Sequence, residues 1–264
     1  MTPIVRLALE EDIGSGDVTT AACVPEFQAA SGRFVGREPL IVAGLELLTE
    51  LYDRVHLRKR GGDACAEGEI IAEVSGRART LLERERVALN FLQRLSGVAT
   101  VARRFAEAVA GTNCQVLDTR KTTPGMRHLE KMAARAGGVT NHRMGLFDAV
   151  LIKNNHIAAA GGVRNAIERA RTCGFPIEIE VRSREELREA LECGAAHLLL
   201  DNLTPEEAAD WVREIAGRAK VELSGGITLD NVRAYAETGA DFVSSGAITH
   251  SARAVDISFR LELA

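Results

Sequence analysis

The sequence lacks the features that would place the protein in a membrane, in an oxidising compartment or on nucleic acid. It has no stretch of 18 apolar residues, and its first segment turns acidic before any long apolar run, so we expect neither a membrane span nor a signal peptide. A formal net charge of −4 argues against binding to nucleic acid or an anionic membrane, because such surfaces are basic. The five cysteines form no CxxC pair, and we interpret them as reduced thiols of a cytoplasmic protein.

Several common catalytic signatures are also missing. There is no GxxxxGK[ST] phosphate loop, no cluster of cysteine and histidine with metal-ligand spacing, and no low-complexity segment. With 264 residues and 46% hydrophobic content, the chain is nevertheless long enough for a sizeable core.

Six short apolar runs follow one another after about residue 112, with amphipathic helical segments between them. Nearly continuous apolar runs are typical of parallel strands that are covered on both faces, and their alternation with helices predicts a parallel α/β sheet or barrel. Roughly 150 residues are fewer than the about 250 of a complete eight-unit barrel, so we predict an incomplete barrel of six or seven strands. The runs are CQVLD (114–118), DAVLI (148–152), IEIEV (177–181), HLLLD (197–201), KVELS (220–224) and DFVSS (241–245).

The first hundred residues have a different pattern, which predicts a separate α+β domain. Short strands are expected at 32–36, 55–60 and 68–76, and a helix at 45–55. A longer helical segment begins at Arg79, and we expect it to break near Ser96 and Gly97. The last ten residues alternate like a strand and could return to this domain. Between the later runs, Thr204 and Pro205 mark a helix start, and Gly194 and Gly217 mark helix ends.

Polar, ionisable or glycine residues follow nearly every predicted barrel strand. In α/β barrels the chemistry gathers in the loops after the carboxyl ends of the strands, so these residues are expected on one rim. They are Asp118, Thr119, Arg120 and Lys121; Lys153 to His156; Glu180 with Arg182; Asp201 and Asn202; Ser224, Gly225 and Gly226; and Ser245, Gly246 and Ala247.

The last two of these strand ends predict a phosphate site. Their glycines would let backbone N–H groups approach an anion, and a helix start follows; ordinary tight turns are the alternative. Glu180 and Asp201 end neighbouring strands and could share Mg²⁺ with a diphosphate and ribose hydroxyls, or could simply be solvated carboxylates.

Segment 118–156 is strongly basic although the whole protein is acidic. It contains seven basic and three acidic residues, which predicts a small, highly charged anionic ligand. Arg120 and Arg143 suit carboxylates, because a guanidinium can hold two oxygens at once. His142 is as often a hydrogen-bonded spacer as a ligand contact.

The same segment contains a basic helix. Arg127, Lys131 and Arg135 are spaced four residues apart, and for at least some of them we expect a solvated helix face.

Taken together, the motifs resemble the quinolinate phosphoribosyltransferase family, also called nicotinate-nucleotide pyrophosphorylases. The resemblance runs through almost the whole chain in order. Its motifs are EEDIGSGDVTT (10–20), LNFLQRLSGVAT (89–100), DTRKTTPG (118–125), GGVTNHRMGLFDAVLIKNNH (137–156), EIEV (178–181), LLLDN (198–202), SGGI (224–227) and SSGAITHS (244–251). Val139 and Ser245 stand where many members have glycine and valine, and neither difference removes a charge.

The resemblance implies an α/β protein with an N-terminal α/β sandwich domain and an incomplete parallel α/β barrel of the type II phosphoribosyltransferases. We place the sandwich at residues 1–98, joined by 252–264, and the catalytic barrel at 99–251. The implied reaction transfers phosphoribosyl from phosphoribosyl pyrophosphate (PRPP) to quinolinate with decarboxylation. It yields nicotinate mononucleotide, diphosphate and CO₂ in de novo NAD biosynthesis, and is carried out by a homodimer or a higher oligomer.

The resemblance also implies roles for single residues. Quinolinate would be held by Arg120, Arg143 and Lys153, with Thr119, Lys121 and His142 beside it and Arg94 reaching in from a partner subunit. Glu180 and Asp201 would face the ribose and Mg²⁺. The 5-phosphate would lie against Ser224, Gly225, Gly226, Ser245, Gly246 and Ala247. The implied catalytic residues are Lys121, Lys153, Glu180 and Asp201.

Three other functions are compatible with a barrel of this kind. Lys153 at a strand end could be the nucleophile of a Schiff-base aldolase, although the cations around it look like carboxylate clamps. A paralogue on the same scaffold, like the molybdenum-associated relatives, could bind a different anion, but the two arginines for a dicarboxylate are present. A pure binding protein is the least favoured, because it would not need a metal-competent carboxylate pair.

Overall fold

The computed structural model describes residues 1–263. Residue contacts divide these into two compact units. The first contains residues 1–103, 123–138 and 251–264, of which the structure describes all but the last residue, and the second contains residues 104–122 and 139–250. Segment 123–138, which lies inside the range predicted for the barrel, thus clusters with the first unit.

The second unit is built on a six-stranded sheet in which every described strand pair is parallel. The strands are β6 (Gln115–Leu117), β7 (Val150–Ile152), β8 (Ile177–Val181), β9 (His197–Asp201), β10 (Lys220–Ser224) and β11 (Phe242–Ser244). Their order is β6-β11-β10-β9-β8-β7, and Thr140 adds an isolated parallel bridge to Leu117. The predicted incomplete parallel barrel is therefore confirmed.

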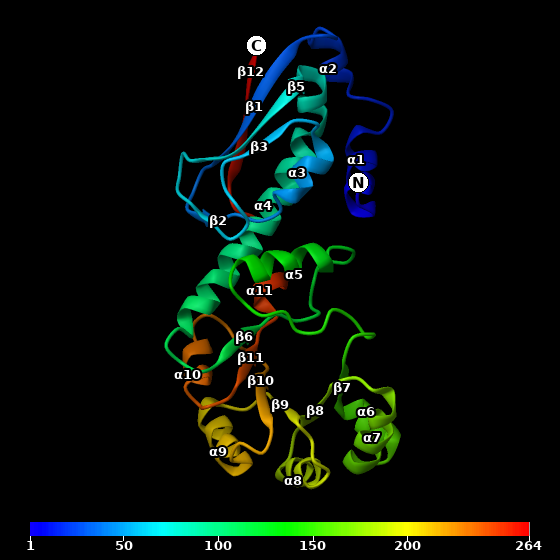
Figure 1. The fold of residues 1–264 in the computed structure, drawn as a ribbon, viewed down its shortest axis with the longest axis vertical. Helices are drawn as coiled ribbons and strands as arrows, with labels where there is room; N and C mark the ends of the chain where they lie inside the picture. Colours follow the sequence, from blue (N-terminus) through cyan, green and yellow to red (C-terminus); the bar gives the residue numbers. More distant parts are fainter. Residues whose placement is uncertain (264) are drawn as a thin grey trace. The chain divides into compact units, whose positions relative to one another are not determined.

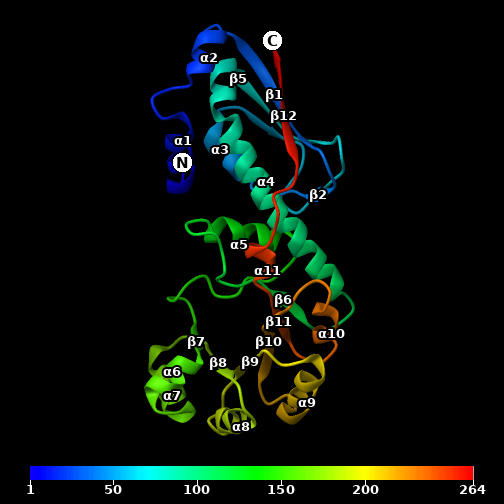
Figure 2. The ribbon, with the colours of Figure 1, turned by 180° about the vertical axis from the view of Figure 1, so that it is seen from behind.

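Helices lie along the outer side of this sheet (Figures 1 and 2). They are α6 (Asn154–Ala160), α7 (Val163–Ala170) with the 3₁₀ turn η1 (Arg171–Cys173), α8 (Arg184–Glu192), α9 (Pro205–Ile215) and α10 (Val232–Ala236). The short helix α11 (Ala247–His250) lies instead at the end of the strands (Figure 1). The predicted start of α9 is confirmed, because Thr204 and Glu207 each accept a hydrogen bond from the other's backbone N–H. After α9 the chain turns through Ala216 and Gly217, both with positive φ.

The first unit contains a four-stranded antiparallel sheet with the order β12-β1-β5-β3. Its strands are β1 (Ala29–Gly36), β3 (Val55–Leu57), β5 (Ile70–Arg77) and β12 (Ile257–Leu263), and β2 (Leu40–Ile41) and β4 (Ala64–Cys65) form a smaller ladder. The C-terminal segment therefore returns to this domain as predicted, and Phe259 faces Phe34 with ring centroids 4.9 Å apart. This unit contains the helices α1 (Pro3–Ile13), α2 (Val18–Cys23), α3 (Glu46–Leu51) and α5 (Arg127–Ala136), and most of the long helix described next.

One long helix, α4 (Ala78–Ala108), shows that the predicted break near Ser96 and Gly97 is wrong. Ser96 is buried, and its hydroxyl oxygen accepts a hydrogen bond from the Ala43 N–H at 3.1 Å. A Cβ atom at position 97 would lie 2.0 Å from the carbonyl oxygen of Arg253. Gly97 thus allows a close backbone approach and does not end the helix.

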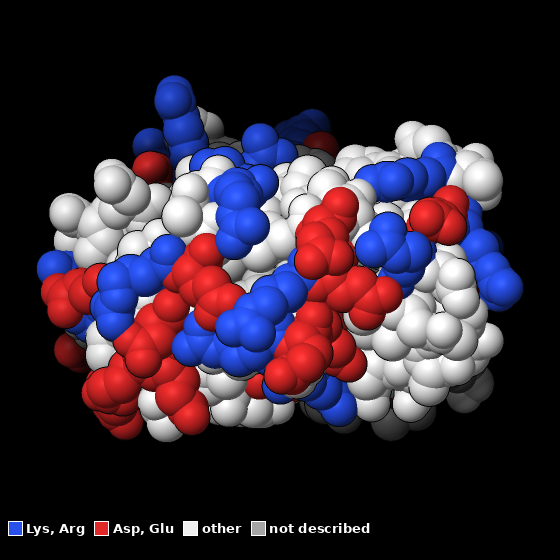
Figure 3. Space-filling model, turned by 90° about the horizontal axis from the view of Figure 1, so that it is seen from below, with Lys and Arg blue, Asp and Glu red and all other residues white. Residues whose placement is uncertain are grey.

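The helices of the second unit carry mixed charge on their exposed side. On the face that Figure 3 shows, lysine and arginine alternate with aspartate and glutamate. Arg184 and Arg188 of α8 both pair with Glu214 of α9. Such alternation is not the basic surface that nucleic acid requires. No helix within residues 1–263 is long and apolar enough to cross a membrane.

Candidate active site

The end of β6 fixes the start of the loop at 141–149. Asp118 is fully buried, and its carboxylate accepts hydrogen bonds from Asn141 Nδ2 at 2.6 Å and from the His142 backbone N–H at 2.9 Å. Farther along, Asp148 accepts from the backbone N–H groups of Met144 and Gly145 at 2.6 and 2.9 Å. The two carboxylates shape the loop, and sequence reasoning assigned a role to neither.

Arg143 and Arg120 lie close enough to repel each other. The pKa of Arg143 lies below its ordinary value, because burial and the positive charge of Arg120 disfavour its charged form more than the charges of Asp148 and Glu178 favour it. One guanidinium nitrogen of Arg143 donates to the carbonyl oxygen of Ala149 at 3.1 Å. The structure thus brings together the two predicted carboxylate-binding arginines.

A second charged cluster lies at the ends of β7, β8 and β9. Glu180 is almost fully buried, and its two carboxylate oxygens lie 2.9 Å from Lys153 Nζ and 2.7 Å from an Arg182 guanidinium nitrogen. The pKa of Asp201 is raised by burial and by the charge of Glu180, although Lys153, Arg182 and Lys121 act in the opposite direction. The four residues predicted as catalytic therefore influence one another.

Arg182 was noted at a strand end but given no role. It also lies 3.9 Å from Asp201, so it contributes positive charge to both acidic residues. Its position could have indicated a role in the site, because Arg182 is the first polar residue after β8 and lies two positions beyond Glu180.

The loop after β10 has the backbone conformation that only glycine adopts easily. Gly225 and Gly226 have φ of 99° and 60°, and a Cβ on Gly225 would lie 2.3 Å from Asn202 Oδ1. Ser245 is buried, and its hydroxyl donates to the Ile227 carbonyl oxygen at 2.7 Å. The Ser245 side chain therefore connects the two loops of the predicted phosphate site.

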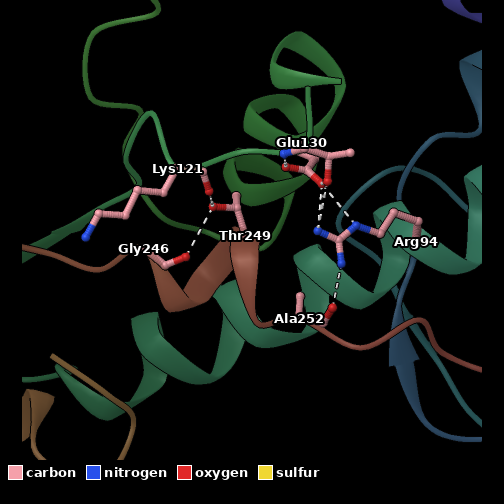
Figure 4. Close-up of polar contacts among 7 residues, drawn as sticks. Arg94, Lys121, Glu130, Gly246, Thr249 and Ala252 are labelled. Carbon is pink, nitrogen blue, oxygen red and sulfur yellow. Dashed lines mark hydrogen bonds and ion pairs between the residues drawn. The ribbon is translucent and has the colours of Figure 1, made fainter. Parts of the chain in front are cut away.

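The short helix α11 positions Lys121 (Figure 4). The fully buried Thr249 hydroxyl donates to the Lys121 carbonyl oxygen at 2.7 Å, and the Lys121 N–H donates to Thr119 Oγ1 at 3.0 Å. A Cβ on Gly246 would lie 2.7 Å from Lys121 Cδ, so a larger residue there would displace the lysine. Sequence reasoning missed Thr249, because a threonine inside a four-residue helix carries no special signal.

His142 is surrounded by acidic residues from inside the barrel. Its Nε2 lies 3.2 Å from Glu178 and 3.4 Å from Glu222, and its Nδ1 lies 2.7 Å from the Arg143 backbone nitrogen. Burial would lower the pKa of His142, but the two glutamates outweigh it and raise the pKa to about 9. Burial also raises the pKa of Glu222. Both glutamates lie within strands, so the strand-end rule could not find them.

Arg94 is engaged within the first unit (Figure 4). Its Nε and one terminal nitrogen lie 3.0 and 2.7 Å from the same oxygen of the fully buried Glu130, and another nitrogen donates to the Ala252 carbonyl oxygen at 2.5 Å. Its contribution to a partner's site stays a prediction. On the same helix as Glu130, the expected solvated face holds for the exposed Arg135 but not for Lys131, which is fully buried.

Two family models match consecutive parts of the chain. The N-terminal domain model of quinolinate phosphoribosyl transferase matches residues 17–96, and the C-terminal domain model matches residues 98–260. The chain belongs to the quinolinate phosphoribosyltransferase family. This confirms the family, function and enzyme class that the sequence motifs predicted.

Individual relatives agree with this family. A probable nicotinate-nucleotide pyrophosphorylase [carboxylating] of Bacillus subtilis is 42% identical over 96% of this chain and 90% of its own length. The nicotinate-nucleotide pyrophosphorylase [carboxylating] of Mycobacterium leprae is 41% identical over 97% and 95%. The crystal structure of NadC from Streptococcus pyogenes has a TM-score of 0.94 and 37% identity, and the match covers 100% of this chain and 99% of that one.

Proposed function

We propose that this phosphoribosyltransferase joins the phosphoribosyl group of PRPP to the ring nitrogen of quinolinate and releases diphosphate and CO₂, so that nicotinate mononucleotide is formed. The observation that carries the proposal is the pair of mutually repelling guanidinium groups, Arg120 and Arg143, in a barrel whose strand ends also carry Glu180 and Asp201. The first cluster suits a small dicarboxylate, and the second suits the ribose and diphosphate of the other substrate.

Quinolinate binding relieves an electrostatic strain. The charge of Arg120 disfavours the charged form of Arg143, and a ligand with two carboxylates would offset this effect, because each arginine can hold two oxygens. Lys153 adds a third positive charge beside Glu180. With nicotinate, which has a single carboxylate, part of the repulsion would persist, so this site favours the dicarboxylate.

The phosphoribosyl group would lie across the neighbouring strand ends. The loop at Gly225 and Gly226 exposes backbone that can approach the 5-phosphate, and Gly246 keeps Lys121 beside the second phosphate loop. Glu180 and Asp201 would face the ribose, where positive charge develops as the bond to diphosphate breaks. Lys121 and Lys153 would attract the oxygens of the departing diphosphate.

The same carboxylate pair fits Mg²⁺. Both ligands are oxygens, and the raised pKa of Asp201 shows that its negative charge remains unfavourable even beside three cationic side chains. A bound ion would supply the positive charge that neutralises diphosphate as it leaves. Glu180 and Asp201 would hold it together with substrate oxygens.

The chemistry then follows in two steps. The lone pair of the quinolinate ring nitrogen forms the new bond to the anomeric carbon, and the carbon–oxygen bond to diphosphate breaks with its electrons. The carbon–carbon bond to the 2-carboxylate breaks next. Its electron pair flows toward the new pyridinium, a proton then replaces CO₂ at the ring, and nicotinate mononucleotide results. Positioning and electrostatics supply the catalysis in this account.

We further propose that the protein acts in the cytoplasm as a homodimer. In support, large apolar side chains are exposed in each unit, at Leu7, Val18 and Phe27 in the first and at Leu146 and Phe147 in the second. Schiff-base chemistry is less well supported, because Lys153 is half exposed and paired with Glu180, whereas a nucleophilic lysine is desolvated.

The test is a turnover assay of the purified protein with PRPP, Mg²⁺ and either quinolinate or nicotinate, with mass detection of the products. Quinolinate labelled at the 2-carboxylate should release labelled CO₂ in step with nicotinate mononucleotide. A folded protein that forms product from neither acid would contradict the proposed function and favour an anion-binding role.

A further inference from the structure

Three side chains, one buried and two largely enclosed, form a connected unit next to Arg143. Glu178 lies in β8 and Glu222 in β10, and the His142 ring lies between them, with its Nε2 at 3.2 and 3.4 Å from their carboxylates. The side chains of His142, Glu178 and Glu222 are 15%, 13% and 4% exposed. The proposed reaction uses neither glutamate, although burying two carboxylates is costly without a purpose.

The hydrogen bonds of the ring identify its tautomer. The Arg143 backbone N–H points at Nδ1 from 2.7 Å, so Nδ1 is an acceptor and carries no proton. The ring proton is therefore on Nε2 and points at the two glutamates. A ring protonated on both nitrogens would turn a second N–H toward that of Arg143.

The same assignment distinguishes hydrogen bonding from metal binding. The ligand atoms of the three residues lie within 4.8 Å of one another, which is compatible with a metal ion. A neutral imidazole ligates a metal through a nitrogen without a proton, and here that nitrogen is Nδ1, which faces away from the glutamates toward the backbone. The unit is consequently a hydrogen-bonded support, in which burial favours an additional proton on Glu222.

A hydrogen bond connects this support to Arg143 of the predicted dicarboxylate site. Each glutamate fixes Nε2, the ring fixes the Arg143 N–H through Nδ1, and Asp118 fixes the backbone of His142 from the other side at 2.9 Å. The charge of Arg120 disfavours the charged form of Arg143, whereas the charges of Asp148 and Glu178 favour it, so Glu178 acts on this arginine through its charge as well as through the ring. We propose that Glu178 and Glu222 are positioning residues, which hold the His142 ring and thereby hold Arg143 in place for the quinolinate carboxylate. This proposal rests on the proposed function of the site.

Variants of the two glutamates distinguish the effect of the hydrogen bonds to His142 from the effect of the negative charges. Glu222→Gln and Glu178→Gln keep an oxygen that can accept from Nε2–H, whereas Glu222→Leu and Glu178→Leu remove it. Loss of a buried hydrogen-bond partner should weaken quinolinate binding about tenfold in the leucine variants, and the glutamine variants should stay within about threefold of the parent protein. The KM for PRPP should change little in all four. Glu214→Leu, which removes a carboxylate on α9, is the matched control.

Nuclear magnetic resonance of the parent protein gives a test that needs no variant. Long-range ¹⁵N–¹H spectra of the assigned His142 ring should show a proton on Nε2 and a hydrogen-bonded acceptor at Nδ1. A proton on Nδ1, or on both nitrogens at neutral pH, would overturn the proposal, as would leucine variants that fold and bind quinolinate like the parent. If the parent does not bind quinolinate, the proposed function fails. The His142 spectrum then still shows whether the ring donates from Nε2 to the glutamates and accepts at Nδ1 from the Arg143 N–H.

Discussion

Replacing Arg143 by alanine should weaken quinolinate binding much more than PRPP binding. A bidentate, charge-assisted contact contributes about 1.5 to 3 kcal/mol. Arg143 is partly buried beside Arg120, so its removal also relieves repulsion between the two arginines, and the net loss should lie at the low end of that range. We expect about 1.5 to 2 kcal/mol, which corresponds to a tenfold to thirtyfold increase in Kd.

Calorimetry with quinolinate and steady-state kinetics with PRPP would measure this difference. Arg143→Lys keeps the charge but loses the planar fork, so its Kd should fall between those of the alanine variant and the parent. Arg164→Ala removes one positive charge from α7, where the side chain is half exposed and pairs with Glu192, and it serves as the control. Equal losses of affinity for the two substrates in Arg143→Ala would refute the assignment of this arginine to a carboxylate.

Three other changes have defined outcomes. Glu130→Gln should lower the free energy of unfolding by about 3 kcal/mol in urea denaturation, because it breaks the ion pair between the buried Glu130 and Arg94. The control Glu214→Gln should change the free energy of unfolding little. Similar small changes in both variants would contradict a structural role for the pair. Arg182→Ser should tighten Mn²⁺ binding in the presence of diphosphate about twofold to fivefold, measured by electron paramagnetic resonance, because the half-exposed Arg182 competes with the metal ion for Glu180. The control Arg188→Ser should leave the affinity for Mn²⁺ unchanged. An unchanged affinity in Arg182→Ser would exclude that competition. His142, Glu178 and Glu222 titrate together, and the contacts that raise the pKa of His142 from 6.5 to about 9 mean that the folded cluster holds one additional proton, which the tautomer of His142 places on Glu222. The stabilising contribution of this proton is complete below pH 6.5 and is lost as the pH rises toward 9, with a slope of at most about 1.4 kcal/mol per pH unit. Denaturation midpoints of the parent that fall no faster over this range than those of Glu222→Leu would contradict this.

The strand ends could be predicted from sequence because of a simple geometric rule. In a parallel sheet the carboxyl ends of all strands meet at one edge, so Lys153, Glu180 and Asp201 had to lie near one another once the strands were recognised. Periodicity alone was enough to recognise β8, β9 and β10, whose bounds coincide with the predicted runs. The sheet order and the closeness of Arg120 to Arg143 were not accessible in this way.

The supporting residues could not be predicted, because their signals are those of ordinary structure. Glu178 and Glu222 alternate with apolar residues in strands, a pattern that usually indicates a solvated face. Here it reflects an interior that is filled by side chains and contains a histidine from a distant loop. The break predicted at Gly97 was wrong for a related reason. The sequence does not distinguish a glycine that leaves room for the Arg253 backbone from a glycine that ends a helix.

The most direct test of the account compares quinolinate with nicotinate in a calorimetric titration of the purified protein. The paired guanidinium groups of Arg120 and Arg143 predict that quinolinate binds at least about tenfold more tightly, because only the dicarboxylate neutralises both. Equal affinities for the two acids, or tighter binding of nicotinate, would contradict a site built for two carboxylates.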